Sequence, residues 1–284
     1  MFTRLSNTTQ ALLFYLLAVG LSTLVALLTV ALDKPNAVGF VMFTPLLALL
    51  LMLCVITREG YSKASWQALG LQRMGWRGWP MALWLPLVLL AGSYMISCLL
   101  GVADWQWPRD IGIGAYTASL VASLLIDTLF ALGEEIGWRG YLLPKLLGLG
   151  RVRAVVVVGL LHGVWHLPLI LLTPFYHGDG YRLIVVPLLL LTLTVGGIFY
   201  GYLRLSTNSL WPVALAHGAF NTIWSALAAL TVPTSALWME YLSGESGIIT
   251  LILAMIAVSF LLHRLATPET PIYVREKLVR LETA

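Results

Sequence analysis

The stretch AYTASLVASLLIDTLFALGEEIGWRG, residues 115–140, decides the fold of this chain. It begins as an apolar run long enough to cross a bilayer, which takes about 20 residues of helix. It ends on Glu134, Glu135 and Arg139. A charged side chain at bilayer depth costs from about 3 to more than about 10 kcal/mol, so charges in such a segment usually mark a functional site. The stretch therefore predicts a membrane helix that carries a reaction centre.

The composition of the whole chain is that of a membrane protein. Of the 284 residues, 59% are hydrophobic and 11% are charged, and the mean hydropathy is +0.88. A soluble domain carries about 25% charged residues. Only Cys54 and Cys98 are present, and we expect them near opposite faces of the membrane and unpaired. The sequence thus provides no disulfide framework and no cysteine cluster for a metal.

The apolar runs predict an all-α fold, a bundle of about eight transmembrane helices. The first run is too long for the core of a signal peptide, so we expect a retained helix. Residues 1–284 are expected to form a single membrane-embedded domain, with a short polar tail at 267–284 that lies in the cytoplasm. The expected spans are 11–32, 38–56, 80–101, 115–137, 152–172, 183–204, 209–230 and 246–264.

The distribution of basic residues predicts the orientation, because cytoplasmic loops are rich in Lys and Arg. Of the 17 basic residues, thirteen fall on one side, three on the other, and Arg139 lies within the candidate site. A cytoplasmic N-terminus and C-terminus satisfy this rule, and the bias explains the pI of about 9.1 without a nucleic-acid partner. The cytoplasmic set is Arg4, Arg58, Lys63, Arg73, Arg77, Lys145, Arg151, Arg153, Arg204, Arg264, Arg275, Lys277 and Arg280, and the outer set is Lys34, Arg109 and Arg182.

Two further polar fragments lie in apolar runs, each with two polar side chains four residues apart. One is His162-Gly-Val-Trp-His166 and the other is His217-Gly-Ala-Phe-Asn221. With Glu134 at the inner end of its span, the predicted orientation places all three fragments in the inner half of the bilayer. A shared cavity at that depth is the expectation.

Helical geometry suggests how the residues pair. Glu135 and Arg139 are four residues apart and can form an ion pair on one helix face. Glu134 then faces another direction, where a poorly solvated carboxylate can act as a general base. His and Asn side chains are suitable donors to an oxyanion. Asp127, also in this span, is expected to support the site or to bond a neighbouring helix.

Each feature also has an ordinary structural explanation. The Glu135–Arg139 pair could be a structural salt bridge, and His162 alone is more typical of packing or hydrogen bonding between helices. Asn221 could join helices by a hydrogen bond, as polar side chains in membrane bundles often do. The coincidence of these features in one layer favours a reaction centre.

The three motifs, Glu-Glu-x-x-x-Arg, aromatic-x-x-x-His and His-x-x-x-Asn, in this order on helices of an eight-span protein, resemble those of the CPBP intramembrane proteases. That family includes type II CAAX prenyl endopeptidases and bacterial proteins linked to bacteriocin processing or self-immunity. The resemblance covers about 117–224, where the catalytic motifs lie. It implies hydrolysis of a peptide bond in a membrane-associated or lipid-modified peptide, with a prenylated protein as one kind of substrate.

The resemblance also implies a role for each residue. Glu134 would activate the water, Glu135 and Arg139 would order the site, and His166 would assist proton transfer. The remaining catalytic candidates, His217 and Asn221, would form the oxyanion hole. The second motif usually begins with Phe, where this chain has His162, so the role of His162 is open.

Three hypotheses follow. The first is a metal-independent glutamate protease, which needs no cofactor. The second is a zinc protease, with Glu134, His162, His166 and His217 as ligands, although the HExxH signature is absent. The third is a non-catalytic scaffold or immunity protein, or a proton-coupled transporter. The expected partners are membrane lipids and a peptide substrate, and the expected location is a prokaryotic plasma membrane.

Overall fold

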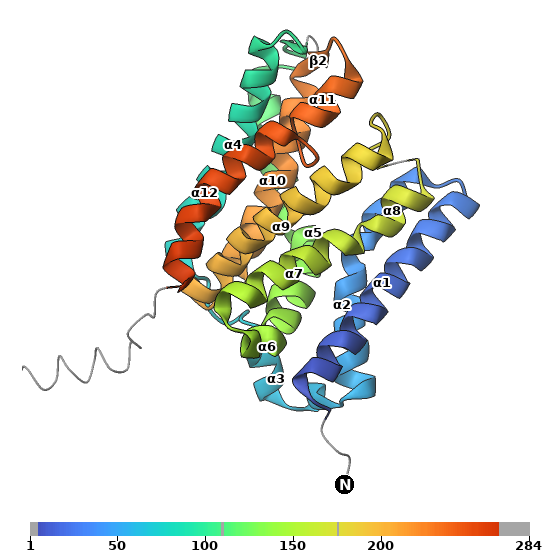
Figure 1. The fold of residues 1–284 in the computed structure, drawn as a ribbon, viewed down its shortest axis with the longest axis vertical. Helices are drawn as coiled ribbons and strands as arrows, with labels where there is room; N and C mark the ends of the chain where they lie inside the picture. Colours follow the sequence, from blue (N-terminus) through green and yellow to red (C-terminus); the bar gives the residue numbers. More distant parts are fainter. Residues whose placement is uncertain (1–4, 109–110, 175, 267–284) are drawn as a thin grey trace, which may run out of the picture.

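The computed structural model describes residues 5–108, 111–174 and 176–266, and these fold into a bundle of helices with one small two-stranded sheet (Figure 1). The sheet pairs two antiparallel strands at one end of the bundle, with Asp104 opposite Val232. The all-α membrane fold predicted from the sequence is confirmed. The C-terminal tail, Arg4, Arg109, Arg275, Lys277 and Arg280 lie outside the described residues.

Long helices along the chain are separated by short helical segments and by the two strands of the sheet. In chain order, the elements are α1 (Asn7–Ala31), η1 (Pro35–Phe43), α2 (Thr44–Leu50), η2 (Leu51–Ile56), η3 (Glu59–Tyr61), α3 (Lys63–Ala68), η4 (Trp76–Gly78), α4 (Trp79–Leu99), β1 (Ala103–Trp105), α5 (Ile113–Glu135), η5 (Ile136–Leu142), α6 (Leu143–Leu146), η6 (Leu147–Leu149), α7 (Arg151–Trp165), α8 (Leu167–Leu172), α9 (Arg182–Thr207), α10 (Trp211–Ala229), β2 (Thr231–Pro233), α11 (Ala236–Leu242) and α12 (Ile248–Ala266). Of the η segments, η2 and η5 are π-helical and the others are 3₁₀.

Seven helical segments among the described residues are long and apolar enough to cross a membrane. They are Asn7–Ala31, Pro35–Ile56, Trp76–Leu99, Ile113–Leu149, Arg151–Leu172, Arg182–Thr207 and Ile248–Ala266. The predicted span at 209–230 is a helix, α10, but it is not apolar enough to be one of the seven. It packs against α4, α5 and α9. Because protein surrounds it, α10 can carry polar residues that a lipid-facing helix cannot.

The fourth span is longer than predicted. We expected it to end at residue 137, but helical structure continues through η5, α6 and η6 to Leu149. Glu134 therefore lies 21 residues after Ile113 and 15 before Leu149, in the middle of the segment rather than at its end. Gly137 and Gly140 did not stop the helix, because neighbouring helices enclose this part of it and both glycines are buried.

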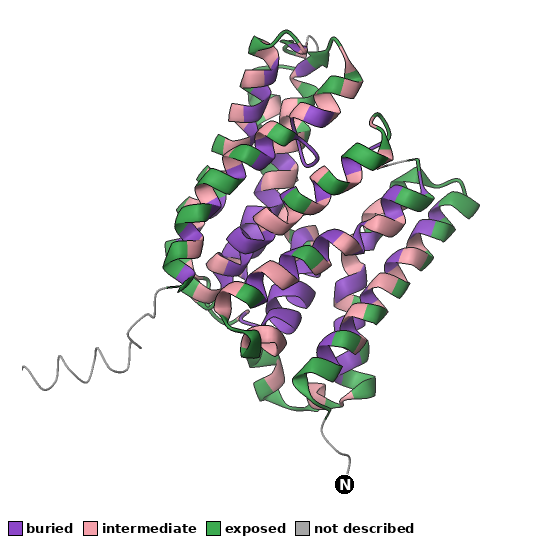
Figure 2. Cartoon of the chain, in the orientation of Figure 1, coloured by how far each residue is buried: buried purple, intermediate pink, exposed green. Residues whose placement is uncertain are grey.

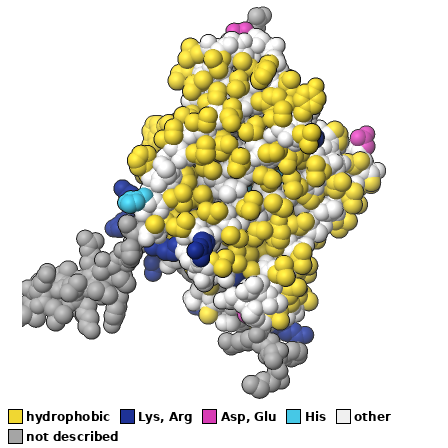
Figure 3. Space-filling view, in the orientation of Figure 1, with side chains coloured by type: hydrophobic (Ala, Val, Ile, Leu, Met, Phe, Trp, Pro, Cys, Tyr) yellow, Lys and Arg dark blue, Asp and Glu magenta, His cyan; other side chains and the backbone are white. Residues whose placement is uncertain are grey.

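Burial divides this segment into two parts. Between Ile113 and Phe130 the side chains are exposed or half-buried, whereas residues 133–143 are all buried. Figure 2 shows the buried residues gathered in the middle of the bundle. Figure 3 shows that the outer surface of this view is mostly hydrophobic, with Lys and Arg mainly at the end where α1 begins. An apolar outer surface around a buried polar centre is the arrangement of an integral membrane protein.

The loop at 243–247 enters the interior instead of lying on the surface. All five of its residues are buried, and Figure 2 shows it descending between the helices. Ser243 Oγ donates a hydrogen bond to Ser93 O at 3.1 Å and lies 2.7 Å from Ser97 Oγ. Non-helical backbone is tolerated at membrane depth only where protein or a cavity surrounds it. This loop therefore brings Glu245 into the interior.

Both cysteines are unpaired, as predicted: Cys54 is exposed and Cys98 is half-buried. Asp127 accepts a hydrogen bond from Thr222 Oγ1 at 2.5 Å. This contact joins α5 to α10, so of the two roles expected for Asp127, the structure shows the bond to a neighbouring helix.

Candidate active site

Glu135 and Arg139 form the ion pair predicted from their spacing. Arg139 Nη1 lies 2.8 and 3.0 Å from the two carboxylate oxygens of Glu135, and neither side chain is exposed. Arg139 belongs to η5, the π-helical turn that follows α5. Isolated π-turns often occur at functional sites. A buried arginine opposite a buried glutamate leaves no net charge in this pair.

A close approach of α7 and α9 completes the surroundings of Arg139. A Cβ atom at Gly197 would lie 2.4 Å from Gly159 Cα, so only glycine fits there. Arg139 Nη2 donates to Gly197 O at 3.4 Å, and its guanidinium carbon lies 5.1 Å from the centre of the Tyr200 ring. Small residues let membrane helices approach closely. Here the approach also places a backbone acceptor beside the arginine.

His162 bridges Arg139 and Glu134. Its Nε2 is 2.9 Å from Glu134 Oε2, and its Nδ1 is 3.3 Å from Arg139 Nη1. Arginine can only donate, so Nδ1 must accept, and the ring proton is on Nε2. His162 therefore donates to Glu134 and leaves the second carboxylate oxygen of Glu134 unoccupied by this contact. The position that the sequence left open is in direct contact with the candidate base.

A break between α7 and α8 orients His166. The His166 backbone N–H donates to Gly163 O at 3.0 Å, a tighter turn than an α-helix makes, and Pro168 follows in the first turn of α8. The His162 carbonyl is then free to accept from His166 Nδ1 at 3.0 Å. This hydrogen bond places the proton on Nδ1 and leaves Nε2 of a neutral ring as an acceptor.

His217 and Asn221 reach the site from α10. His217 Nδ1 is 2.9 Å from Glu135 Oε1, and the His217 ring stacks on Tyr200 with centroids 5.3 Å apart. A Cβ atom at Gly218 would lie 2.5 Å from Thr128 N, so glycine permits α10 to approach α5 at this level. Glu135 consequently accepts from Arg139 and from His217.

These residues meet at a cavity of about 230 Å³. Four of the predicted catalytic residues line it, and Glu135 and Arg139 lie behind its wall. Its lining also includes one side of η1 and several aromatic side chains. The lining residues are Val38, Gly39, Val41, Met42, Glu134, Trp165, His166, Leu169, Tyr176, His217, Asn221, Trp224, Ser225 and Glu245.

A second polar cluster, which the sequence did not predict, contributes Tyr176 and Glu245 to the lining of this cavity. Tyr176 donates to Glu245 through its hydroxyl, and its ring stacks on His166 with an interplanar angle of 19°. His177 contacts Glu240 at 2.5 Å and Glu245 at 3.3 Å. The sequence feature that could have indicated this cluster is a pair of acids, Glu240 and Glu245, in a short polar segment between apolar runs.

The electrostatics of this cluster favour charged partners. Burial alone would lower the pKa of His177, but its hydrogen bonds to Glu240 and Glu245 outweigh burial and raise the pKa to about 9. Burial alone would raise the pKa of Glu245, but its hydrogen bond to His177 and further favourable interactions lower it to about 2. We refer to Tyr176, His177, Glu240 and Glu245 as the loop cluster.

Three of the four residues proposed for zinc lie close together. Donor atoms of Glu134, His162 and His166 lie within 4.8 Å of one another and all three residues are buried. His217, the fourth residue proposed as a ligand, contacts Glu135 Oε1 through its Nδ1 at 2.9 Å. His162 Nε2 already donates to Glu134, and a guanidinium occupies the other ring nitrogen. In this arrangement, zinc bound to Glu134 and His162 would have to displace the hydrogen bond between them.

The comparison with known families decides the class of the protein. A sequence model of the family described as "Type II CAAX prenyl endopeptidase Rce1-like" matches residues 46–223. The chain belongs to this family. A search of curated proteins found no match. Membership supports a CAAX-type endopeptidase in the membrane, and it implies a peptide or prenylated protein as substrate. The resemblance drawn from the three motifs is thereby confirmed.

Proposed function

We propose that this Rce1-like protein hydrolyses a peptide bond inside the membrane with a water molecule activated by Glu134. One observation carries the proposal: Glu134 is held by His162 through one carboxylate oxygen and lines a cavity with His166, His217 and Asn221. A positioned base, a second proton acceptor and hydrogen-bond donors around one cavity are the parts that acyl transfer to water requires.

The first step is the attack of water on the carbonyl carbon of the scissile bond. Glu134 removes one proton from the water, while His166 Nε2 accepts a hydrogen bond from the other O–H and orients the oxygen. The carbon–oxygen bond forms as the carbonyl π-electrons move onto oxygen. The proton on Glu134 then passes to the leaving nitrogen as the carbon–nitrogen bond breaks. The products are a carboxylate and an amine, and Glu134 returns to its starting state.

The tetrahedral oxyanion needs donors on the other side of the cavity. The Asn221 amide supplies N–H groups in any protonation state, and His217 supplies one when its Nε2 carries a proton. Because Nδ1 donates to Glu135, a proton on Nε2 makes the ring an imidazolium, and the Glu135 carboxylate stabilises that form. One oxyanion-hole donor is worth roughly 10²–10³ in rate.

The substrate we propose is a membrane-associated or lipid-modified peptide. The cavity is lined mainly by apolar and aromatic side chains, which suits a segment that arrives from the bilayer. The gathering of Lys and Arg at the end where α1 begins supports a cytoplasmic location for that face (Figure 3). We infer that both termini are cytoplasmic and that the site receives substrates from that side or laterally.

A simple assay tests whether the proposed reaction is independent of a metal. Purified protein in detergent or nanodiscs would be incubated with a fluorogenic peptide, with and without a chelator. We expect cleavage to persist, and metal analysis to find less than one zinc per chain. Loss of cleavage that zinc restores would favour the zinc protease over the glutamate protease.

The substrate itself can be identified by comparing membrane peptides from cells that carry the wild type or Glu134→Ala. A specific peptide should accumulate in the Glu134→Ala cells. Glu59→Ala is the matched control, because Glu59 in η3 pairs with Lys145 Nζ at 3.5 Å and does not line this cavity. If the peptides of Glu134→Ala and wild-type cells are the same while a biological activity persists, a non-catalytic scaffold is favoured.

A further inference from the structure

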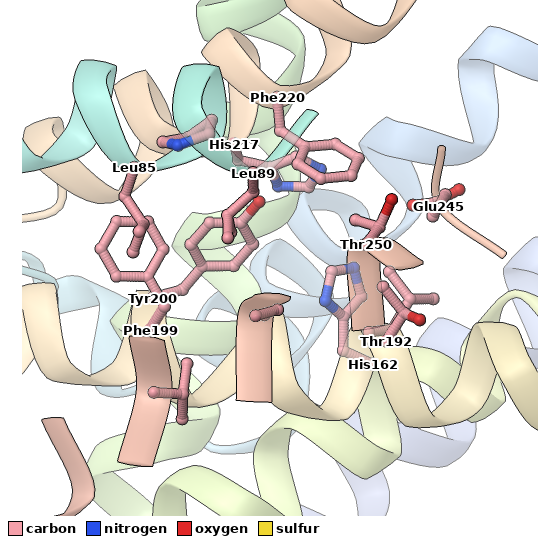
Figure 4. A pocket seen from close by; sticks show the side chains of 15 residues that line it. Leu85, Leu89, His162, Thr192, Phe199, Tyr200, His217, Phe220, Glu245 and Thr250 are labelled. Carbon is pink, nitrogen blue, oxygen red and sulfur yellow. The ribbon is translucent and has the colours of Figure 1, made fainter. Parts of the chain in front are cut away.

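A second, smaller cavity lies behind the candidate active site, between α4, α9, α10 and α12. Its volume is about 50 Å³. His217 and Glu245 line both cavities, and His162, which contacts Glu134, lines this one. Figure 4 shows Leu85, Leu89, Phe199 and Tyr200 at one end of the second cavity. The second cavity therefore adjoins the reaction centre through shared walls.

The polar end of this cavity contains two buried hydroxyls with no hydrogen-bond partner among the described residues. They are Thr192 Oγ1 on α9 and Thr250 Oγ1 at the start of α12. Thr192 is 5% exposed and Thr250 is 1% exposed. Figure 4 shows both side chains at the end of the cavity where His162 and Glu245 lie.

Such hydroxyls are unusual in a folded protein, because buried polar groups are nearly always hydrogen-bonded. Thr194, two residues along α9, follows the rule by donating to Leu190 O at 2.6 Å. Thr192 on the same helix does not, although the carbonyl four residues before it is equally a helical acceptor. Six buried side-chain atoms lack a partner among the described residues, and these two line one cavity. A bound polar molecule would satisfy both.

The volume and the polar groups of this cavity indicate that its ligand is water. A water site needs roughly 10–15 Å³ of such space and two to four polar partners. The cavity offers room for a few waters and a polar end formed by Thr192, Thr250, Glu245 and the two histidines. Water can donate to a hydroxyl and accept from it, so one molecule can satisfy a threonine in either direction.

We propose that this cavity is a water store for the hydrolytic reaction. This proposal rests on the proposed function. Waters bound at Thr192 and Thr250 pass beside His217 and Glu245 to reach Glu134. Each bond hydrolysed consumes one water, and the surrounding hydrocarbon supplies none. A store beside the reaction centre allows the water to be replaced while a substrate fills the main cavity.

An activity-independent experiment tests the site. The protein would be prepared in nanodiscs with ¹³C-labelled threonine methyl groups, and magnetisation transfer from water to each methyl would be measured by NMR. We expect cross-peaks with water for Thr192 and Thr250, and none for Thr194. Absence of both cross-peaks would overturn the proposal. This result does not depend on proteolysis, so it separates failure of the water site from failure of the proposed function.

Thr→Val variants test the consequence of hydration. If the hydroxyls are dry, Thr192→Val and Thr250→Val remove an unsatisfied polar group and should raise Tm. Bound water predicts an unchanged or lower Tm. In the peptide assay we expect the double variant to lose several-fold in kcat with little change in KM, and Thr194→Val to behave as wild type. A raised Tm with wild-type kcat would contradict the water store.

Discussion

Two polar clusters are joined through His166, which bonds to the His162 carbonyl and stacks on Tyr176, and they are built in different ways. The core cluster, which we define as Glu134, Glu135, Arg139 and His162, lies on membrane helices. The loop cluster comes from the segment before α9 and the segments at α11 and before α12. In the core cluster, Glu135 and Arg139 form an ion pair although they are only four residues apart on one continuous helical segment. In the loop cluster, every ion pair joins segments more than 60 residues apart.

The difference indicates that the two clusters have different roles. The core cluster contains the candidate base and its fixed partners. The loop cluster contributes Tyr176 and Glu245 to the cavity wall and holds the Tyr176 ring against His166. Damage to the core cluster should therefore abolish turnover, whereas damage to the loop cluster should loosen the protein and alter its response to pH.

The largest expected effect is the loss of the base. Glu134→Gln keeps the size of the side chain and can still accept from His162 Nε2, but it cannot take a proton from water. We expect kcat to fall by roughly 10²–10⁴, the range for general-base catalysis, with Tm close to wild type. Peptide cleavage by purified protein measures this change. Glu245→Gln is the matching variant in the loop cluster. If kcat fell equally in Glu134→Gln and Glu245→Gln, the two clusters would not have different roles.

The second effect concerns stability of the core cluster. Arg139→Leu leaves Glu135 without its cation in a site where neither side chain is exposed. Removing one partner of a buried pair costs about 3–5 kcal/mol. Unfolding in mixed micelles should show this loss. We expect Glu135→Gln/Arg139→Leu to cost less than the sum of its single variants, and strict additivity would show that the pair is not coupled.

A smaller effect is expected at the oxyanion side. Asn221→Ala removes an amide from the cavity wall without touching the Glu135–Arg139 pair. We expect a fall of roughly 10²-fold in kcat, a KM within a few-fold of wild type, and an unchanged Tm. Asn221→Gln, which keeps the amide but moves it, should recover little. A wild-type kcat in Asn221→Ala would show that Asn221 does not stabilise the oxyanion.

The smallest effect is the pH dependence of the loop cluster. The pKa of His177 is raised from 6.5 to about 9, so its contribution to stability is complete below about pH 6.5 and is lost as the pH rises through 9. The pKa of Glu245 is lowered from 4.5 to about 2, so its contribution is complete above 4.5 and is lost as the pH falls towards 2. Both contributions are complete between about pH 4.5 and 6.5.

His177→Gln should therefore lower Tm most between pH 4.5 and 6.5, and the difference from wild type should shrink towards pH 9. Thermal unfolding in detergent at a series of pH values measures it. A difference that is constant across this range would show that the charge of His177 does not stabilise the fold.

Sequence reasoning succeeded where local geometry decides the contact. The spacing of Glu135 and Arg139 predicted their ion pair, and three motifs on three spans predicted the cavity that Glu134, His166 and His217 share. It placed Glu134 at the end of a span because the charges were taken as the end of the apolar run. Burial of residues 133–143 by other helices is a tertiary effect that hydropathy does not contain.

The contacts that sequence reasoning missed are set by the fold at long range. His162 on α7 reaches both Glu134 on α5 and Arg139 on η5, although 28 and 23 residues separate them in the chain. Glu245 reaches the cavity because its loop enters the bundle. Neither position follows from a period in the sequence.

The π-helical turn at η5 makes chain length a determinant of the site. Each residue of an α-helix advances about 100° around the axis, so deleting one residue from Ile136–Leu142 would rotate everything that follows by about that angle. Pro144, Lys145 and the start of α7 would then face new neighbours, although no charged side chain had been removed. A deletion scan should therefore find this turn more sensitive to the loss of a residue than to most substitutions.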